Sequence, residues 1–188
     1  MHYKVLRAVS AAIVGFLMLL GAGGAHAALV NFSITGIIDG SDVPGPYGLG
    51  VGDMVTASGS FDDSAMSTSP YTVYFDLSHP GNSMSIAAGS LTLDQTQDAN
   101  YSAGGSPRLE FDSGGNLIGV NFYWGAVDGS SFDSGVLGFI VNDPNYLATG
   151  SWNASSFTTT PVPVPAAMWL FGSGLLGLAG AIRRRKNS

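Results

Sequence analysis

The feature that most constrains the fold is a series of short runs in which apolar and polar residues alternate. Val30, Phe32 and Ile34 alternate with polar residues in the first of these runs. The same period of two recurs in residues 55–61, 71–77 and 118–124. Successive side chains of a β-strand point to opposite faces, so each run predicts a strand with one buried face. No window of comparable length has apolar residues at helical spacing, and the middle of the chain is therefore predicted to be all-β.

Turn-forming residues separate these runs and set the expected architecture. Clusters rich in Gly, Pro, Asn and Asp occur at residues 39–42, 44–46, 80–82, 112–116, 128–129 and 142–145. About eight strands bounded in this way predict an antiparallel β-sandwich, either jelly-roll-like or immunoglobulin-like. The clearest hairpin joins residues 108–111 to residues 117–120.

The last of the alternating runs predicts which aromatic side chains are buried. Tyr123 and Trp124 are neighbours on one strand, so one ring must point inward and the other outward. We expect Trp124 to join Ile118, Val120 and Phe122 in the core. Tyr123 is then left on the solvent face.

Charge is distributed very unevenly along the 188 residues. All 13 acidic residues lie between Asp39 and Asp143, whereas Arg108 is the only base in that stretch. A domain with a net charge near −12 lacks the cations that neutralise phosphate, which excludes nucleic acid as a partner. The chain also contains no cysteine, so packing rather than disulfides must stabilise it.

The two ends of the chain predict export and membrane insertion. Lys4 and Arg7 precede an apolar run and the small residues Ala25 and Ala27, which is the pattern of a signal peptide over residues 1–27 cleaved before Ala28. Residues 28–157 are predicted to form the sandwich ectodomain, and residues 158–165 a Thr/Pro-rich linker. Residues 166–182 predict a transmembrane helix, and the basic residues 183–188 a cytoplasmic tail.

The C-terminal segment resembles a known sorting signal. Its elements are Val162-Pro163-Val164-Pro165, then Trp169, Gly172 and Gly174 in an apolar run, and the cluster Arg183, Arg184 and Arg185. This order resembles the PEP-CTERM protein-sorting signal, with Val164 in place of the glutamate of the Pro-Glu-Pro core. The resemblance implies processing by an exosortase in the inner membrane of a Gram-negative bacterium that makes exopolysaccharide. It also implies transient membrane anchoring, followed by delivery to the cell surface or extracellular matrix.

The reactive side chains of the middle segment limit its chemistry. His79 is its only histidine and Glu110 its only glutamate, so a zinc site built from Cys and His is excluded. His79 lies in a predicted turn, which disfavours a catalytic role. The aspartates leave a glycosidase as an alternative, because glycoside hydrolysis needs only two carboxylates. Oxygen-rich turns can supply ligands for calcium, and the candidate residues are Asp39, Asp42, Asp62, Asp63, Asp112 and Asn116. The competing interpretation is that these residues cap turns.

The sequence therefore favours a non-enzymatic, exported protein with no required cofactor and a structural or adhesive role at the bacterial surface or in its exopolysaccharide matrix. A carbohydrate-binding or calcium-dependent lectin-like module on the same scaffold is the main alternative. Its aromatic platforms would come from Tyr71, Tyr74, Tyr123, Trp124 or Trp152. An aspartate-based glycosidase is the weaker alternative.

Overall fold

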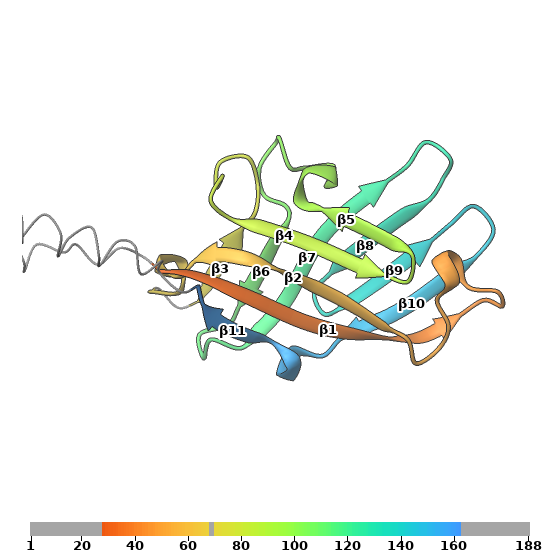
Figure 1. The fold of residues 1–188 in the computed structure, drawn as a ribbon, viewed down its shortest axis with the longest axis horizontal. Helices are drawn as coiled ribbons and strands as arrows, with labels where there is room; N and C mark the ends of the chain where they lie inside the picture. Colours follow the sequence, from red (N-terminus) through yellow and green to blue (C-terminus); the bar gives the residue numbers. More distant parts are fainter. Residues whose placement is uncertain (1–27, 68–69, 163–188) are drawn as a thin grey trace, which may run out of the picture.

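The structure is a computed structural model that describes residues 28–67 and 70–162. This part of the chain is almost entirely β-structure (Figure 1). The strands are β1 (Leu29–Ser41), β2 (Met54–Asp62), β3 (Tyr71–Tyr74), β4 (Ser83–Ala88), β5 (Leu91–Asp94), β6 (Arg108–Phe111), β7 (Leu117–Gly125), β8 (Ser131–Gly135), β9 (Gly138–Asn142), β10 (Leu147–Trp152) and β11 (Thr158–Pro161). The helical segments are short 3-10 turns: η1 (Pro46–Gly48), η2 (Asp63–Ser67), η3 (Gln95–Gln97) and η4 (Ala154–Ser156).

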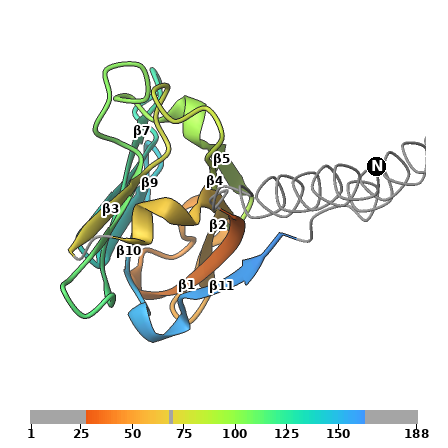
Figure 2. The ribbon, with the colours of Figure 1, turned by 90° about the vertical axis from the view of Figure 1, so that its left-hand side faces the viewer.

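All of the strand pairs are antiparallel, and hydrogen bonds join the strands in the order β3-β6-β7-β8-β9-β10-β1-β2-β4-β5. The long strand β1 connects the two halves of this path. Its first part pairs with β2 on one side and β11 on the other, whereas its last part pairs with β10. Seen along its length, the sheet is curled, with β3, β7, β9 and β10 on one side and β1, β2, β4 and β5 on the other (Figure 2).

The all-β, antiparallel part of the fold prediction is confirmed. A β-sandwich consists of two sheets packed face to face, whereas hydrogen bonds here join the strands into one continuous path through β1 and β10. The finer assignment to a jelly-roll-like or immunoglobulin-like sandwich therefore stays a prediction. The predicted signal peptide and transmembrane helix lie outside the described residues. Within residues 28–67 and 70–162, no helix is long and apolar enough to cross a membrane.

The core forms where the inward faces of the curled sheet meet. Val30, Phe32 and Ile34 of β1 are all buried, as their alternation predicts. Phe32 packs against Phe61 and Phe75, with ring centroids 5.8 and 5.4 Å apart. Burial of these aromatic side chains, together with the aliphatic side chains around them, supplies most of the driving force for folding in a domain without disulfides.

The predicted hairpin between β6 and β7 is confirmed, but two of the expected core residues are exposed. Ile118 is 43% exposed because a register shift opposite Glu110 and Phe111 leaves it without a partner. Such a bulge reverses the alternation of faces, so that Leu117 is buried instead. Leu77 is 60% exposed because β3 ends at Tyr74 and the chain turns.

The prediction for the end of β7 is confirmed for Tyr123, which is 45% exposed. Trp124 is only partly buried, although it packs against the core cluster as expected. The structure also adds a strand, β11, at the start of the segment that the sequence predicts to be a linker.

Candidate functional site

Asp39 and Asp42, the first pair of calcium candidates, accept hydrogen bonds from the neighbouring strand β10. A side-chain oxygen of Asp39 accepts a hydrogen bond from the hydroxyl of Thr149, with a distance of 3.0 Å between the oxygens. A carboxylate oxygen of Asp42 accepts from the amide of Leu147 at 2.8 Å. Both aspartates therefore connect the end of β1 to β10.

In the other two pairs, the aspartates accept hydrogen bonds from backbone amides, either of their own turns or of Ala28, just before β1. Asp62 Oδ1 accepts from the amide of Ser64 at 2.8 Å, and Asp63 Oδ1 accepts from the amide of Ala28 at 2.8 Å. Asp112 Oδ1 accepts from the amides of Gly114 and Asn116 in the β6–β7 turn. The contacts of Asp62 and Asp112 are those of turn-capping residues, whereas Asp63 ties its turn to the residue that precedes β1.

These hydrogen bonds stabilise the ionised carboxylates. The hydrogen bonds from Asn116 lower the pKa of Asp112, and those from Ser64 lower the pKa of Asp62. In the part of the chain that the structure describes, no three side chains of the His, Asp and Glu type are grouped so that they could hold a metal ion. Calcium binding therefore stays a prediction.

Two buried aspartates, Asp76 and Asp98, hold loops of the domain in place, and neither is among the candidate residues predicted from the sequence. Both are only 4% exposed. Asp98 Oδ2 accepts from the hydroxyl of Ser106 and from the amide of Tyr123, each at 2.7 Å, and its Oδ1 accepts from the amide of Asn100 at 2.8 Å. This carboxylate therefore ties the loop between β5 and β6 to the backbone of β7.

Asp76 organises the turn after β3 in the same way. Its Oδ1 accepts from the amide of Ser78 at 2.9 Å and lies 2.8 Å from Nδ1 of His79, while its Oδ2 accepts from the amide of Gly105. Burial raises the pKa of Asp76, but the hydrogen bonds from His79, Gly105 and Ser78 outweigh burial and hold the pKa below its ordinary value. In both aspartates, the side chain accepts from the amide two residues onward. The exposed Asp62 and Asp112 make the same contact, so this local pattern does not distinguish the buried pair.

His79 lies in this turn, as predicted, and its ring stacks on Tyr74 with centroids 5.5 Å apart. It lines a hollow of about 390 Å³ together with Asp62, Ser64 and Asn82. The Asp76–His79 contact resembles two members of a catalytic triad. Among the described residues, no hydrogen bond joins a serine hydroxyl to His79.

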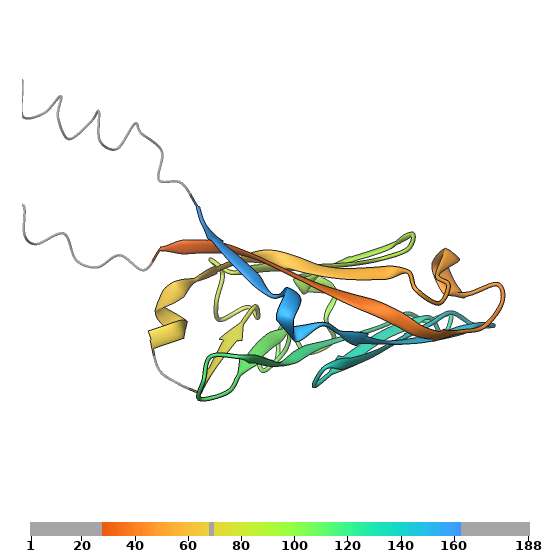
Figure 3. The ribbon, with the colours of Figure 1, turned by 90° about the horizontal axis from the view of Figure 1, so that it is seen from below.

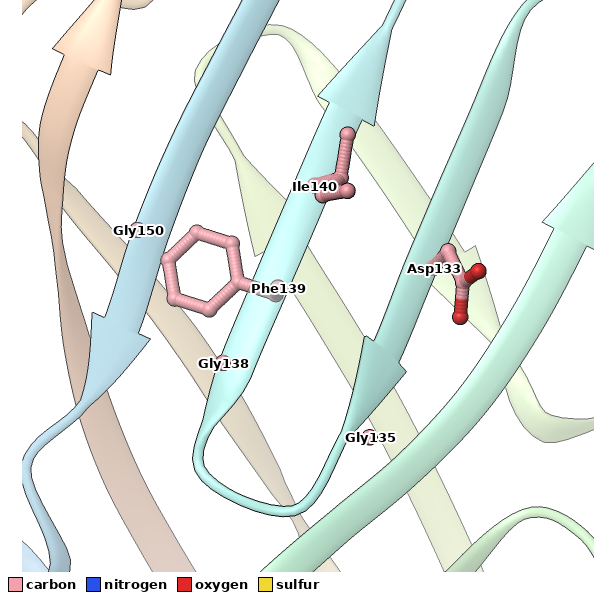
Figure 4. Close-up of a pocket in the computed structure, with 6 residues that line it drawn as sticks. All are labelled: Asp133, Gly135, Gly138, Phe139, Ile140 and Gly150. Carbon is pink, nitrogen blue, oxygen red and sulfur yellow. The ribbon is translucent and has the colours of Figure 1, made fainter.

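A second hollow, of about 360 Å³, lies on the face formed by β8, β9 and β10 (Figure 4). Gly135 and Gly138 face each other across the β8–β9 pair and leave the surface low at this point. Asp133 and Ile140, which also face each other, project beside it. The ring of Phe139 lies toward Gly150 of β10, where a Cβ atom would approach the ring to 2.4 Å.

Tyr123 extends this face. It lies directly opposite Asp133 in the β7–β8 register, so the exposed phenol ring and the exposed carboxylate are neighbours on one face of the sheet. The amide of Tyr123 is held by the buried Asp98, which fixes the backbone beneath the ring. An aromatic ring beside a carboxylate is an arrangement that can stack on a sugar and bind its hydroxyl groups.

Two of the other aromatic residues predicted to stack on a sugar are buried. Trp152 is buried, and its indole Nε1 donates to the hydroxyl of Ser134 at 2.8 Å. Tyr71 is buried and stacks on Phe111 with centroids 4.4 Å apart.

The described part of the chain ends on an edge strand. β11 pairs with β1, and the amide of Val162 donates to the carbonyl of Leu29 at 2.9 Å. The beginning of the described chain at Ala28 and its end at Val162 therefore lie side by side, at the same end of the domain (Figure 3).

Comparison with family models matches residues 161–186 to the PEP-CTERM protein-sorting motif. The chain carries a PEP-CTERM sorting motif. This motif marks a secreted protein that is processed at the membrane by an exosortase-type enzyme and sorted to the cell surface or the extracellular space. No curated protein and no solved structure matches the chain.

Of the predicted PEP-CTERM residues, the structure describes only the first. Val162 follows β11, whereas Pro163, Val164, Pro165, Trp169, Gly172, Gly174, Arg183, Arg184 and Arg185 lie outside the described residues. The same holds for Ala25 and Ala27 of the predicted signal cleavage site. Ala28, the predicted first residue of the mature protein, is the first residue that the structure describes.

Proposed function

We propose that this exosortase-targeted protein is a non-enzymatic, structural or adhesive component of the surface or exopolysaccharide matrix of a Gram-negative bacterium. The observation that carries the proposal is that its acidic side chains hold loops and turns together by hydrogen bonds to backbone amides. Asp76 and Asp98 are buried among loop amides, and the exposed aspartates at Asp62 and Asp112 cap turns. Such carboxylates support a rigid, strongly acidic scaffold, and the sorting motif delivers that scaffold outside the cell.

The proposal is tested by following the chain from membrane to matrix. We expect the protein recovered from the extracellular fraction to lack the C-terminal tail, as measured by the mass of its C-terminal peptide. Deletion of the gene should reduce cohesion of the matrix, and a copy with intact ectodomain and sorting motif should restore it. Intact tails in the extracellular fraction would contradict sorting, and an unchanged matrix after deletion would contradict the structural role.

A carbohydrate-binding role is the second candidate, and the Tyr123 face favours it. An exposed ring on a rigid backbone loses little conformational entropy on binding, which favours stacking against the apolar face of a sugar. Asp133 can accept hydrogen bonds from sugar hydroxyl groups beside the hollow over Gly135 and Gly138. Because Asp133 is acidic and the domain is strongly negative, neutral glycans are the expected ligands.

Glycan-array binding by the purified protein separates this candidate from the first. Tyr123→Ala and Asp133→Asn should each weaken binding at least tenfold, whereas Ile118→Ala, an exposed side chain on the same strand, should not. Loss of binding in EDTA would assign a role to calcium. Glycan turnover abolished by one Asp→Asn change would replace both candidates with a glycosidase.

A further inference from the structure

β11 connects the folded domain to the sorting motif. The match to the motif begins at Pro161, which is the last residue of β11 and lies opposite Val30 of β1. The next residue, Val162, is also bound to the domain through the carbonyl of Leu29. The start of the signal that the processing enzyme reads is therefore part of the β-sheet.

We propose that β11 is a detachable strand, and that it must separate from β1 before the exosortase-type enzyme can process the motif. This inference rests on the sorting described above and adds a conformational step to it. A strand paired along one edge offers only its other edge to an enzyme, whereas a cleft that binds an extended peptide contacts both edges and the side chains. Cleavage of folded proteins commonly requires such local opening.

The side chains of β11 allow it to separate without unfolding the domain. All four of its residues are exposed, so its detachment uncovers little apolar surface. β11 pairs with β1 alone among the described strands. Its attachment therefore depends mainly on the backbone hydrogen bonds to β1.

The segment just before β11 is held much more firmly and sets a limit to the opening. Phe157 packs against the core, with its ring centroid 5.1 Å from that of Phe111. The hydroxyl of Ser156 accepts from the amide of Thr35 at 2.9 Å, and the amide of Asn153 donates to the carbonyl of Thr35 at 2.8 Å. Opening can therefore stop at Phe157 and release residues 158–162.

This release lets the start of the motif move relative to the domain. With β11 paired, only Pro163, Val164 and Pro165 separate the domain from the apolar segment that is predicted to begin at Ala166. An extended chain of three residues spans only about 9 Å. Because β11 is already extended toward the end from which the chain leaves the domain, its release does not lengthen the chain. It makes residues 158–165 a free tether of about 25 Å that can pivot at Phe157. The enzyme can then approach both edges of the released segment.

A disulfide across β1 and β11 tests the proposal, because the chain has no cysteine of its own. Asn31 and Thr160 are exposed and lie opposite each other, at a separation typical of paired strands that a disulfide can bridge. The variant Asn31→Cys/Thr160→Cys is expressed in the full chain, in cells that contain the processing enzyme. Tail removal is then followed by mass spectrometry, and bridge formation by alkylation of free thiols.

We expect the bridged chain to lose its tail at least tenfold more slowly than the parent, and reduction to restore the parent rate. The matched control is Ala87→Cys/Thr92→Cys, which bridges β4 and β5 through two exposed and opposed residues. This control should be processed like the parent.

Processing of the bridged chain at the rate of the control would overturn the detachable strand while leaving sorting intact. Retention of the tail in the parent itself would overturn the sorting, and the inference with it. A second variant, Thr160→Pro, removes an amide donor from β11 and should speed up tail removal. Slower processing of this variant than of the parent would also contradict the proposal.

Discussion

Replacement of Asp98 by asparagine should strongly destabilise the domain, although the two side chains have nearly the same shape. The carboxylate is buried and accepts three hydrogen bonds, from the hydroxyl of Ser106 and the amides of Tyr123 and Asn100. An asparagine side chain has one oxygen and one NH₂ group. In either orientation, its NH₂ group must face at least one of these donors.

The cost follows from which donors lose their acceptor. In the better orientation, the asparagine oxygen faces Ser106 and Tyr123, and the amide of Asn100 is left facing a second donor. One unsatisfied buried donor, together with the loss of charge assistance in the two remaining bonds, costs about 2–4 kcal/mol. This is a large part of the ~5–15 kcal/mol by which domains are stable.

The assay is urea unfolding of the purified protein, followed by tryptophan fluorescence. The matched control is Asp94→Asn, because Asp94 is exposed and caps η3 by accepting from the amide of Thr96, a role that asparagine performs equally well. The free energy of unfolding of the control should change by less than about 0.5 kcal/mol. A loss below about 1 kcal/mol for Asp98→Asn would refute the role assigned to this carboxylate. Hydrogen exchange at the amide of Asn100, which loses its acceptor, should accelerate in Asp98→Asn alone.

Three further substitutions or conditions test other parts of the structure. Ser134→Ala removes the hydroxyl that accepts from the indole of Trp152 and donates to the backbone, and unfolding experiments should show a loss of about 2–3 kcal/mol. Because the folded-state pKa of Asp76 is lowered, its contribution is complete above its unfolded pKa and is lost as pH falls through the folded value. Thermal melts should therefore decline below about pH 4, and less steeply in Asp76→Asn, whereas equal slopes would contradict this. Gly150→Ala places a Cβ atom 2.4 Å from the ring of Phe139 and should cost about 1–3 kcal/mol, and an unchanged denaturation midpoint would show that the ring can move away.

The strands could be predicted from the local sequence. Apolar and polar side chains alternate along a strand, and this alternation shows which face is buried. The buried faces of β1 and β2 follow their alternation in Val30, Phe32, Val55 and Phe61. The same reasoning was wrong for Ile118, where a bulge shifts the register. A bulge depends on how two strands pair, and one strand's own alternation does not reveal it.

The candidate site was less predictable than the strands. Exposure of Tyr123 followed from its position beside Trp124, but its partner Asp133 lies on another strand and became visible only through the β7–β8 register. No sequence pattern around Asp98 distinguishes it from the exposed aspartates. Its burial depends on the loop between β5 and β6 folding against the backbone of β7.

The sequence by itself determined the all-β class and the sorting motif, because alternation, turn chemistry and a linear signal are all properties of neighbouring residues. Only the tertiary structure decided that Ala28 and Val162 lie at the same end of the domain and that β11 incorporates the start of the motif into the sheet. These relations join residues more than a hundred positions apart. Pairing over such distances is set by the packing of the whole sheet around its core, which no local pattern encodes.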